Sequence, residues 1–169
     1  ASCCRIATFQ EFHQPMAVVF QGRVLGFDNP EGNSNPGIKL HIAHVDNNNN
    51  YVVTLNTEKN CAGEVDPAVS CLSIAKEVGH SYTRLASRPY PFRSDGTIYA
   101  WKVLWNHDRL EIYHRKAANP FDRSHDELVL RGPEDTTFES GAVGLYLDGV
   151  LTRFYAFHVW QGEPLTRAG

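Results

Sequence analysis

The chain has 169 residues, of which 42% are hydrophobic and 21% charged, and its formal net charge is −3. This length and composition are those of one globular domain with a sizeable core. Without a basic excess, binding to nucleic acid or to an anionic membrane surface is not expected. No apolar run is long enough to cross a bilayer. We therefore expect a single domain over residues 1–169, with a flexible tail at 162–169 and no membrane insertion.

Cysteine usage suggests an oxidising environment. The four cysteines are Cys3, Cys4, Cys61 and Cys71. A bond between the neighbours Cys3 and Cys4 requires a strained ring, so we expect one of the two pairings that tie the N-terminus to the 61–71 segment. The alternative is four reduced thiols in a cytosolic protein. The chain opens without a methionine, as a trimmed product does, and we expect a secreted, disulfide-bonded protein.

Short β-strands separated by turns account for most of the chain. Residues 16–27 are rich in Val and Phe and precede a run of turn residues. Residues 38–45 and 51–55 alternate around the Asn-rich turn at 46–50, which is the clearest hairpin signal in the sequence. Further strands are expected at residues 72–78, 81–86, 98–105, 109–115, 142–147 and 152–160.

Helix signals are poor. Residues 117–126 contain Asn119-Pro120 and are expected to form a loop. Residues 87–96 contain Pro89 and Pro91 and are expected to form an irregular, exposed connection. Many short strands with turns between them are typical of a sandwich or barrel. The fold class predicted from these patterns is all-β, an antiparallel β-sandwich.

The last third of the chain carries the most recognisable pattern. A Trp-containing strand leads through a polar turn into a strand that ends in Tyr (residues 101–113), a Gly-Ala-Val-Gly-Leu strand follows at 141–145, and the closing strand at 152–159 has a Phe and then a Val. This pattern resembles concanavalin-A-like jelly-roll domains, including laminin-G-like and glycan-associated modules, over residues 37–160. The resemblance implies a jelly roll. Members of that family bind glycans, mediate adhesion to proteins, or act as glycosidases and lyases.

Aromatic side chains are candidates for a sugar-binding surface. Flat rings stack on the apolar faces of sugars, whereas sugar hydroxyls need hydrogen-bonding partners such as Asn, Asp and Arg. Trp101 and Trp105 share one face of a predicted strand, and we expect Tyr51, Arg84 and Tyr90 to complete the surface. For the two tryptophans, the alternative is a position in the core between the sheets. The leading hypothesis is a lectin-like domain that binds a glycan or glycoprotein on a concave sheet face and its rim loops.

Two other functions stay open. Arg and Tyr are favoured in interaction hot spots, so a protein-binding adhesion domain would use a patch of Tyr90, Phe92 and Arg93. A glycan hydrolase or lyase needs two carboxylates, or a His-Tyr-Arg set, in one groove. The Glu-x-Asp-x-x-Glu strand that laminarinase-like hydrolases of the concanavalin-A-like family carry is absent, so catalysis is the less favoured hypothesis and no catalytic residue is assigned. The positions to inspect for it are His41, Tyr51, Arg84 and Glu111.

The Asn-rich turn is also the candidate metal site. Asp46 and the asparagine side chains after it offer hard oxygen ligands, so Asp46 and Asn48 are the candidates for a calcium ion. The alternative is a plain Asn-rich turn without an ion. His41 and His44 lie three residues apart, and on a regular strand they would point to opposite faces, which argues against a shared transition-metal site.

Overall fold

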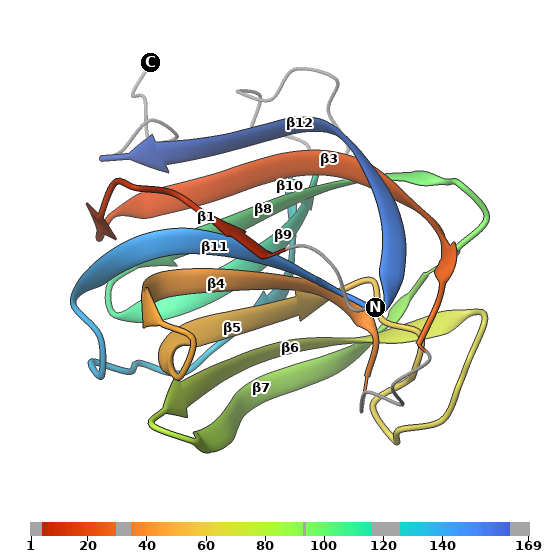
Figure 1. Ribbon diagram of the computed structural model, residues 1–169, viewed down its shortest axis with the longest axis horizontal. Coiled ribbons are helices and arrows are strands. Elements are labelled where there is room, and N and C mark those ends of the chain that lie inside the picture. Colours follow the sequence, from red (N-terminus) through yellow and green to blue (C-terminus); the bar gives the residue numbers. More distant parts are fainter. Residues whose placement is uncertain (1–4, 30–34, 93, 116–125, 163–169) are drawn as a thin grey trace.

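The computed structural model describes residues 5–29, 35–92, 94–115 and 126–162, and these form two antiparallel sheets (Figure 1). One sheet contains β1 (Arg5–Ala7), β2 (Phe12–His13), β4 (Gly37–Asp46), β5 (Asn49–Leu55), β6 (Val69–Val78), β7 (Ser81–Pro91) and β11 (Ser140–Asp148). The other contains β3 (Met16–Phe27), β8 (Ile98–Asn106), β9 (Arg109–Arg115), β10 (Asp126–Arg131) and β12 (Val150–Gln161).

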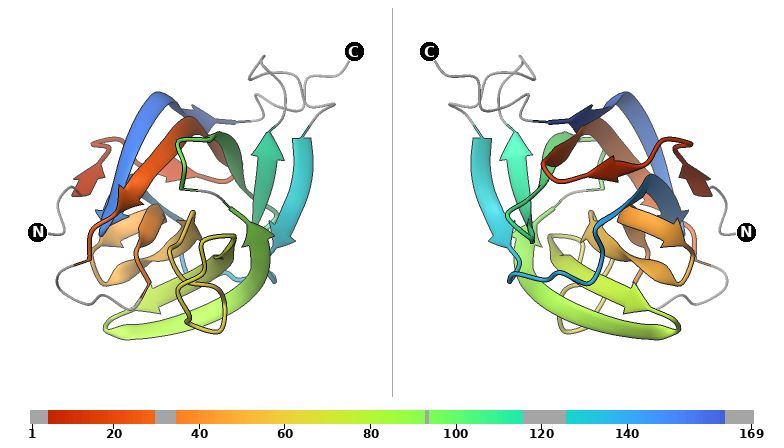
Figure 2. Two further views of the ribbon diagram at one scale, coloured as in Figure 1. Left: turned by 90° about the vertical axis from the view of Figure 1, so that its right-hand side faces the viewer. Right: turned by 90° about the vertical axis from the view of Figure 1, so that its left-hand side faces the viewer.

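The strand order places segments that are distant in sequence side by side. The seven-stranded sheet runs β1-β11-β4-β5-β6-β7, with β2 also paired to β11, and the five-stranded sheet runs β10-β9-β8-β3-β12. Figure 1 looks onto the seven-stranded sheet, and the side views of Figure 2 show β9 and β10 beside the end of β7. There Arg88 Nη1 donates a hydrogen bond to the carbonyl of Val129 (2.9 Å). The predicted all-β antiparallel sandwich is confirmed.

The core lies between the two sheets because side chains alternate along each strand. In β5, Tyr51, Val53 and Leu55 point inward, and in β8, Val103 and Trp105 meet them from the other sheet. All five side chains are at most 2% exposed. Burial of this apolar surface is the main force that holds the sheets together.

Most predicted strands are confirmed. The observed strands differ from the predicted ones mainly in segments that are rich in proline or in charged residues. The predicted strand at 16–27 is β3, and the Asn-rich hairpin joins β4 to β5. β10 was not expected. The predicted loop at 117–126 and tail at 162–169 lie outside the described residues, except for Asp126 in β10 and for Gly162. Among the described residues, no helix has the length and apolar character needed to span a membrane.

The expectation of an irregular connection at 87–96 is wrong for its first half, because β7 continues through Pro91, whereas the expected exposure is found at most of these positions. Pro89 pairs with Cys71, and Pro91 with Val69. Proline lacks an amide hydrogen, and it is tolerated here because β7 is the edge strand of its sheet. Phe92, which follows, is only 4% exposed and packs on Phe27 and Tyr99.

A bulge in β4 changes which side chains share a face. Ala43 has a positive φ of 52°, and the register of β4 with β5 shifts between Ile42 and Asp46. β11 approaches closely enough that a Cβ on Gly141 would lie 2.4 Å from the carbonyl carbon of Ala43. The bulge brings the rings of His41 and His44 to a centroid distance of 5.6 Å. The prediction that these two histidines do not converge is therefore wrong, because it assumed a regular strand.

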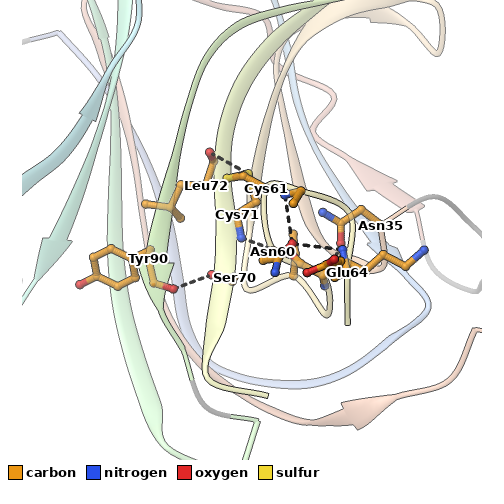
Figure 3. Close-up of a disulfide and its surroundings, with 11 residues drawn as sticks. Asn35, Asn60, Cys61, Glu64, Ser70, Cys71, Leu72 and Tyr90 are labelled. Carbon is orange, nitrogen blue, oxygen red and sulfur yellow. Dashed lines mark hydrogen bonds between the residues drawn. A yellow bond between two sulfur atoms is a disulfide. The ribbon is translucent and has the colours of Figure 1, made fainter. Parts of the chain in front are cut away.

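Among the described residues, a disulfide joins Cys61 to Cys71 (Figure 3). The loop that carries Cys61 folds back beside β6, where Thr57 Oγ1 accepts a hydrogen bond from the Cys71 amide (2.8 Å). This local return of the chain brings the two Cα atoms within 4.8 Å. The predicted bond between the N-terminus and the 61–71 segment is therefore wrong for both of these cysteines. Cys3 and Cys4 lie outside the described residues.

Candidate functional site

The outer face of the seven-stranded sheet, the face turned away from the core, contains a groove of about 530 Å³. Pockets for small ligands commonly have volumes of roughly 300–1,000 Å³. The floor consists of buried side chains from three neighbouring strands, namely His41, Val52, Thr54 and Ser73. The walls and rim consist of more exposed residues, namely Arg5, Asn35, Lys39, Asn47, Asn48, Glu77, Tyr82, Arg84 and Tyr146.

Cross-strand pairing assembles the groove. His41 of β4 pairs with Val52 of β5, Val52 pairs with Ala75 of β6, and Ala75 pairs with Arg84 of β7. Since directly paired residues point to the same face of a sheet, this row runs across the outer face. The neighbouring row contains Arg5, Tyr146, Lys39, Thr54 and Ser73.

One end of the groove is cationic. The Arg5 guanidinium carbon lies 4.8 Å from the centre of the Tyr146 ring, and Lys39 Nζ lies 6.0 Å from the same ring. Lys39 also forms a 2.6 Å ion pair with Asp148, whose side chain is only 4% exposed. The aromatic ring of Tyr146 therefore lies between two cations, an arrangement stabilised by cation–π attraction.

His41 lies on the floor beside this cationic end. Burial lowers the pKa of its imidazole, and the charges of His44, Arg5 and Lys39 lower it further, to about 4. The ring is therefore neutral near pH 7. A neutral imidazole offers one hydrogen-bond donor and one acceptor, so His41 can bind a hydroxyl group in either direction.

The opposite end presents Glu77, Tyr82 and Arg84. Tyr82 is 52% exposed, and Arg84 is also exposed. Within the described residues, neither Glu77 nor Arg84 forms an ion pair. Their polar groups are consequently accessible to a ligand in the groove.

Of the ligand-binding residues predicted from the sequence, Arg84 lines the groove and three others lie in the core. Trp101 and Trp105 are 2% and 1% exposed, which is the alternative that the sequence left open. Tyr51 is 2% exposed; its hydroxyl donates to Asp135 Oδ1 (2.7 Å), and its ring packs edge-on against Trp105. We correct the expected surface position of these three rings, because a buried ring reaches a surface ligand only if the core opens.

Tyr90 lies on the core side of β7 and not in the groove. Its hydroxyl is hydrogen-bonded to His114 Nδ1 (2.9 Å), and its ring packs against Trp101. The patch predicted for a protein partner therefore loses its aromatic members, because Phe92 is buried as well. Arg93 lies outside the described residues.

The residue set inspected for catalysis does not assemble. His41 and Arg84 line the groove, whereas Tyr51 is in the core. Glu111 belongs to β9 in the other sheet, where its Oε2 forms a 2.9 Å ion pair with Arg131. The expected combinations are not brought together, because Tyr51 lies on the inner face of the sheet whose outer face carries His41 and Arg84, and Glu111 lies in the other sheet.

The candidate calcium ligands form a turn. Asp46 Oδ1 accepts hydrogen bonds from the Asn48 amide (2.7 Å) and from the Asn49 side chain (3.0 Å). These bonds lower the pKa of the Asp46 carboxyl. The described part of the chain contains no group of three or more His, Cys, Asp or Glu side chains that could hold a metal ion. The geometry is that of an Asn-rich turn, and calcium binding stays a prediction.

Several groove residues were missed by sequence reasoning. In β4, Lys39 and His41 alternate with the buried Ile38, Leu40 and Ile42, so the period of two was a usable signal for the outer face. The position of Arg5 and Tyr146 in the groove could not be predicted from a local pattern, because only the pairing of β1 with β11 brings these two residues together.

Comparison with known proteins supports the fold. No protein-family model matches the chain, and no curated protein matches its sequence. Among solved structures, the homodimeric agglutinin CG-16 from chicken liver matches with a TM-score of 0.58 at 9% identity, over 93% of this chain and 100% of that one. Lactose- and MES-liganded congerin II matches with a TM-score of 0.58 at 10% identity, over 93% and 98%. Galectin-Ib of Xenopus laevis matches with a TM-score of 0.57 at 12% identity, over the same shares. The chain shares the jelly-roll fold of these galectins, and at such identities the likeness concerns the fold alone.

Proposed function

We propose that the chain is a carbohydrate-binding domain of lectin type and that the sugar lies in the groove on the outer face of the seven-stranded sheet. The observation that carries this proposal is the groove itself, about 530 Å³ in volume and lined mainly by polar side chains. The fold likeness adds support, because one of the matched structures is a lactose-liganded congerin II and another is an agglutinin.

The chemistry of the lining suits a saccharide. Sugar hydroxyls need both donors and acceptors, and Arg84, Glu77 and His41 supply them from three strands. Sugar rings also have apolar faces, and Tyr82 and Tyr146 present aromatic rings at opposite sides of the groove. These groups stand on strands that pair directly, which keeps the cost of ordering them on binding low.

We extend the proposal to the setting in which the domain acts. The Cys61–Cys71 bond supports a secreted protein, since disulfides persist mainly in oxidising compartments. The resemblance over residues 37–160 supports a place among concanavalin-A-like glycan-associated domains. Calcium bound at Asp46 and Asn48 is part of the same proposal and is tested with it.

A glycan-array screen of the folded chain, run with calcium and again with chelator, tests the function. We expect selective binding to a set of glycans. Loss of binding on chelation would support the calcium site, and unchanged binding would remove calcium from the proposal. If a demonstrably folded chain binds no glycan, the lectin proposal fails and adhesion to a protein partner becomes the leading hypothesis.

Two groove variants with matched controls locate the site. Tyr82→Ala and Arg84→Ala are expected to weaken glycan binding, because each removes an exposed contact group from the rim. Tyr155→Ala and Arg153→Ala change the same residue types on exposed positions of β12 in the other sheet, and binding should stay unchanged. Equal losses in both pairs would place the sugar elsewhere.

A further inference from the structure

The groove has a charge sign opposite to that of the whole chain. The formal net charge of the chain is −3. Three cationic side chains, Arg5, Lys39 and Arg84, line the groove, against the single carboxylate of Glu77. Since the chain as a whole has more acidic than basic residues, this local excess of cations is a property of the site. A cleft lined by one sign of charge concentrates ligands of the opposite sign.

The cations differ in how far they are neutralised. Lys39 is paired with Asp148, whose side chain is buried. Arg5 is exposed, stacks on Tyr146, and has no carboxylate partner within the described residues. The end of the groove formed by β1, β11 and β4 therefore keeps an accessible positive charge, and Arg5 is its source.

His41 lies within the field of these cations. The charged and titratable groups that act on it are Arg5 of β1 and Lys39 and His44 of β4, and each of them disfavours its protonated form. Tyr146 of β11 lines the groove on the same side, and Glu77 of β6 and Arg84 of β7 line it further along. The electrostatic environment that disfavours a positive charge on the His41 ring favours a negatively charged group beside it.

Resting on the carbohydrate-binding function proposed above, we propose that the preferred ligand is an acidic saccharide, whose carboxylate or sulfate group binds beside Arg5, Lys39 and Tyr146. The guanidinium of Arg5 can form paired hydrogen bonds with either group. The sugar rings then extend along the floor towards Tyr82 and Arg84. The neutral polar side chains on the floor form hydrogen bonds with the sugar hydroxyls, and the cationic end binds the acidic group of the saccharide.

This arrangement links ligand binding to the protonation of His41. An anion nearby favours the charged imidazole, so binding raises the pKa of His41 above its value of about 4 in the free chain. Binding therefore takes up a proton. The affinity for an acidic saccharide increases as the pH falls towards the His41 pKa, whereas the affinity for a neutral saccharide does not gain from this effect.

Calorimetric titration of the full chain with lactose, sialyllactose and sulfated lactose tests the inference. At low salt, we expect both acidic sugars to bind about fivefold or more tightly than lactose, because a charge-assisted contact is added. The advantage should shrink between about 50 and 300 mM salt as the charges are screened. A preference for only one acidic sugar distinguishes carboxylate from sulfate recognition and retains the inference. Binding of lactose with no advantage for either acidic sugar overturns the inference and leaves the proposed function standing, while no binding of any saccharide overturns the function.

Variants locate the acid-binding end. Arg5→Gln should remove most of the preference for the acidic sugars, measured as the ratio of their affinities to the lactose affinity of the same variant. Arg153→Gln, an exposed arginine on β12 in the other sheet, should preserve the preference. His41→Gln should retain the preference contributed by Arg5 but abolish its increase between about pH 7.5 and about pH 5 with sulfated lactose, because a sulfate ester stays ionised over this range whereas His41 approaches its pKa. A preference that survives Arg5→Gln intact contradicts the assignment.

Discussion

The two faces of the seven-stranded sheet come from the same strands and differ completely in their chemistry. Tyr51, Val53 and Leu55 of β5 point into the core, whereas Val52 and Thr54 between them form the floor of the groove. The inner face packs against Trp101 and Trp105 of the other sheet, and the outer face carries the exposed Arg5 and Arg84 and two tyrosines. Aromatic content alone is thus a poor guide to a sugar-binding surface, because large rings stabilise most when they are buried.

Replacing a ring of the other sheet that packs on this inner face tests the comparison with the largest expected effect. Trp105→Ala removes a fully buried indole and should lower the free energy of unfolding by about 3–5 kcal/mol. Urea denaturation followed by fluorescence or circular dichroism measures the loss. Glycan affinity of the fraction that remains folded should be close to that of the unmodified chain. A large loss of affinity in folded protein would mean that this ring supports the groove directly.

Removing the disulfide gives the next largest effect. Cys71 precedes Ser73 on the outer-face side of β6, and its bond to Cys61 closes a loop with a sequence separation of 10. The double variant Cys61→Ala/Cys71→Ala should lose about 3 kcal/mol of stability, since the unfolded chain gains the freedom of the opened loop. The same denaturation experiment measures it. A loss below about 1 kcal/mol would indicate that the hydrogen bonds around Thr57 hold the loop by themselves.

An ion pair between Lys76 of β6 and Asp135, in the segment between β10 and β11, makes stability depend on pH. Burial of Asp135 opposes its ionisation, but hydrogen bonds from Lys76, Thr137 and Tyr51 outweigh this and hold the pKa of its carboxyl well below the ordinary range. The pKa is depressed in the folded state, so this stabilisation is present above the unfolded-state pKa of about 3.9 and is lost as the pH falls below it.

Asp135→Asn should cost about 1–2 kcal/mol near pH 7, because Lys76 and the buried Tyr51 hydroxyl lose a charged partner. The difference from the unmodified chain should shrink between about pH 5 and about pH 2. Thermal unfolding at a series of pH values measures this. Glu134→Gln is the matched control: its carboxylate is 71% exposed and pairs with Arg109 at the surface, so the change should be small at every pH.

The smallest effect on stability is expected on the outer face. Arg84→Ala should change the free energy of unfolding by less than about 0.5 kcal/mol, because the side chain is exposed and forms no ion pair within the described residues. Paired urea denaturation and glycan titration of one preparation separate the two properties. If stability falls as far as in a core variant, the side chain has a structural role and the contrast between the two faces breaks down.

Most of the strands, the Asn-rich turn and the fold class could be predicted from the sequence alone. These follow from local properties, such as the alternation of β4 and β5 and the Asn-rich turn between them. Such signals depend on neighbours within a few residues, so they can be recognised without knowledge of strand pairing. The proposed polar groove is partly visible in the same way, through Lys39, His41 and Arg84.

Tertiary structure decided the features that depend on distant partners. Which face of β8 is buried depends on the opposite sheet, so the position of Trp105 was open until the sheets were paired. The packing of neighbouring strands decides three further features. These are the bond of Cys71 to Cys61, the bulge that brings His41 close to His44, and the continuation of β7 through Pro91. Arg5 reaches the groove only because β1 pairs with β11, more than a hundred residues away in sequence. Non-local pairing supplies this information, and no local pattern of residues contains it.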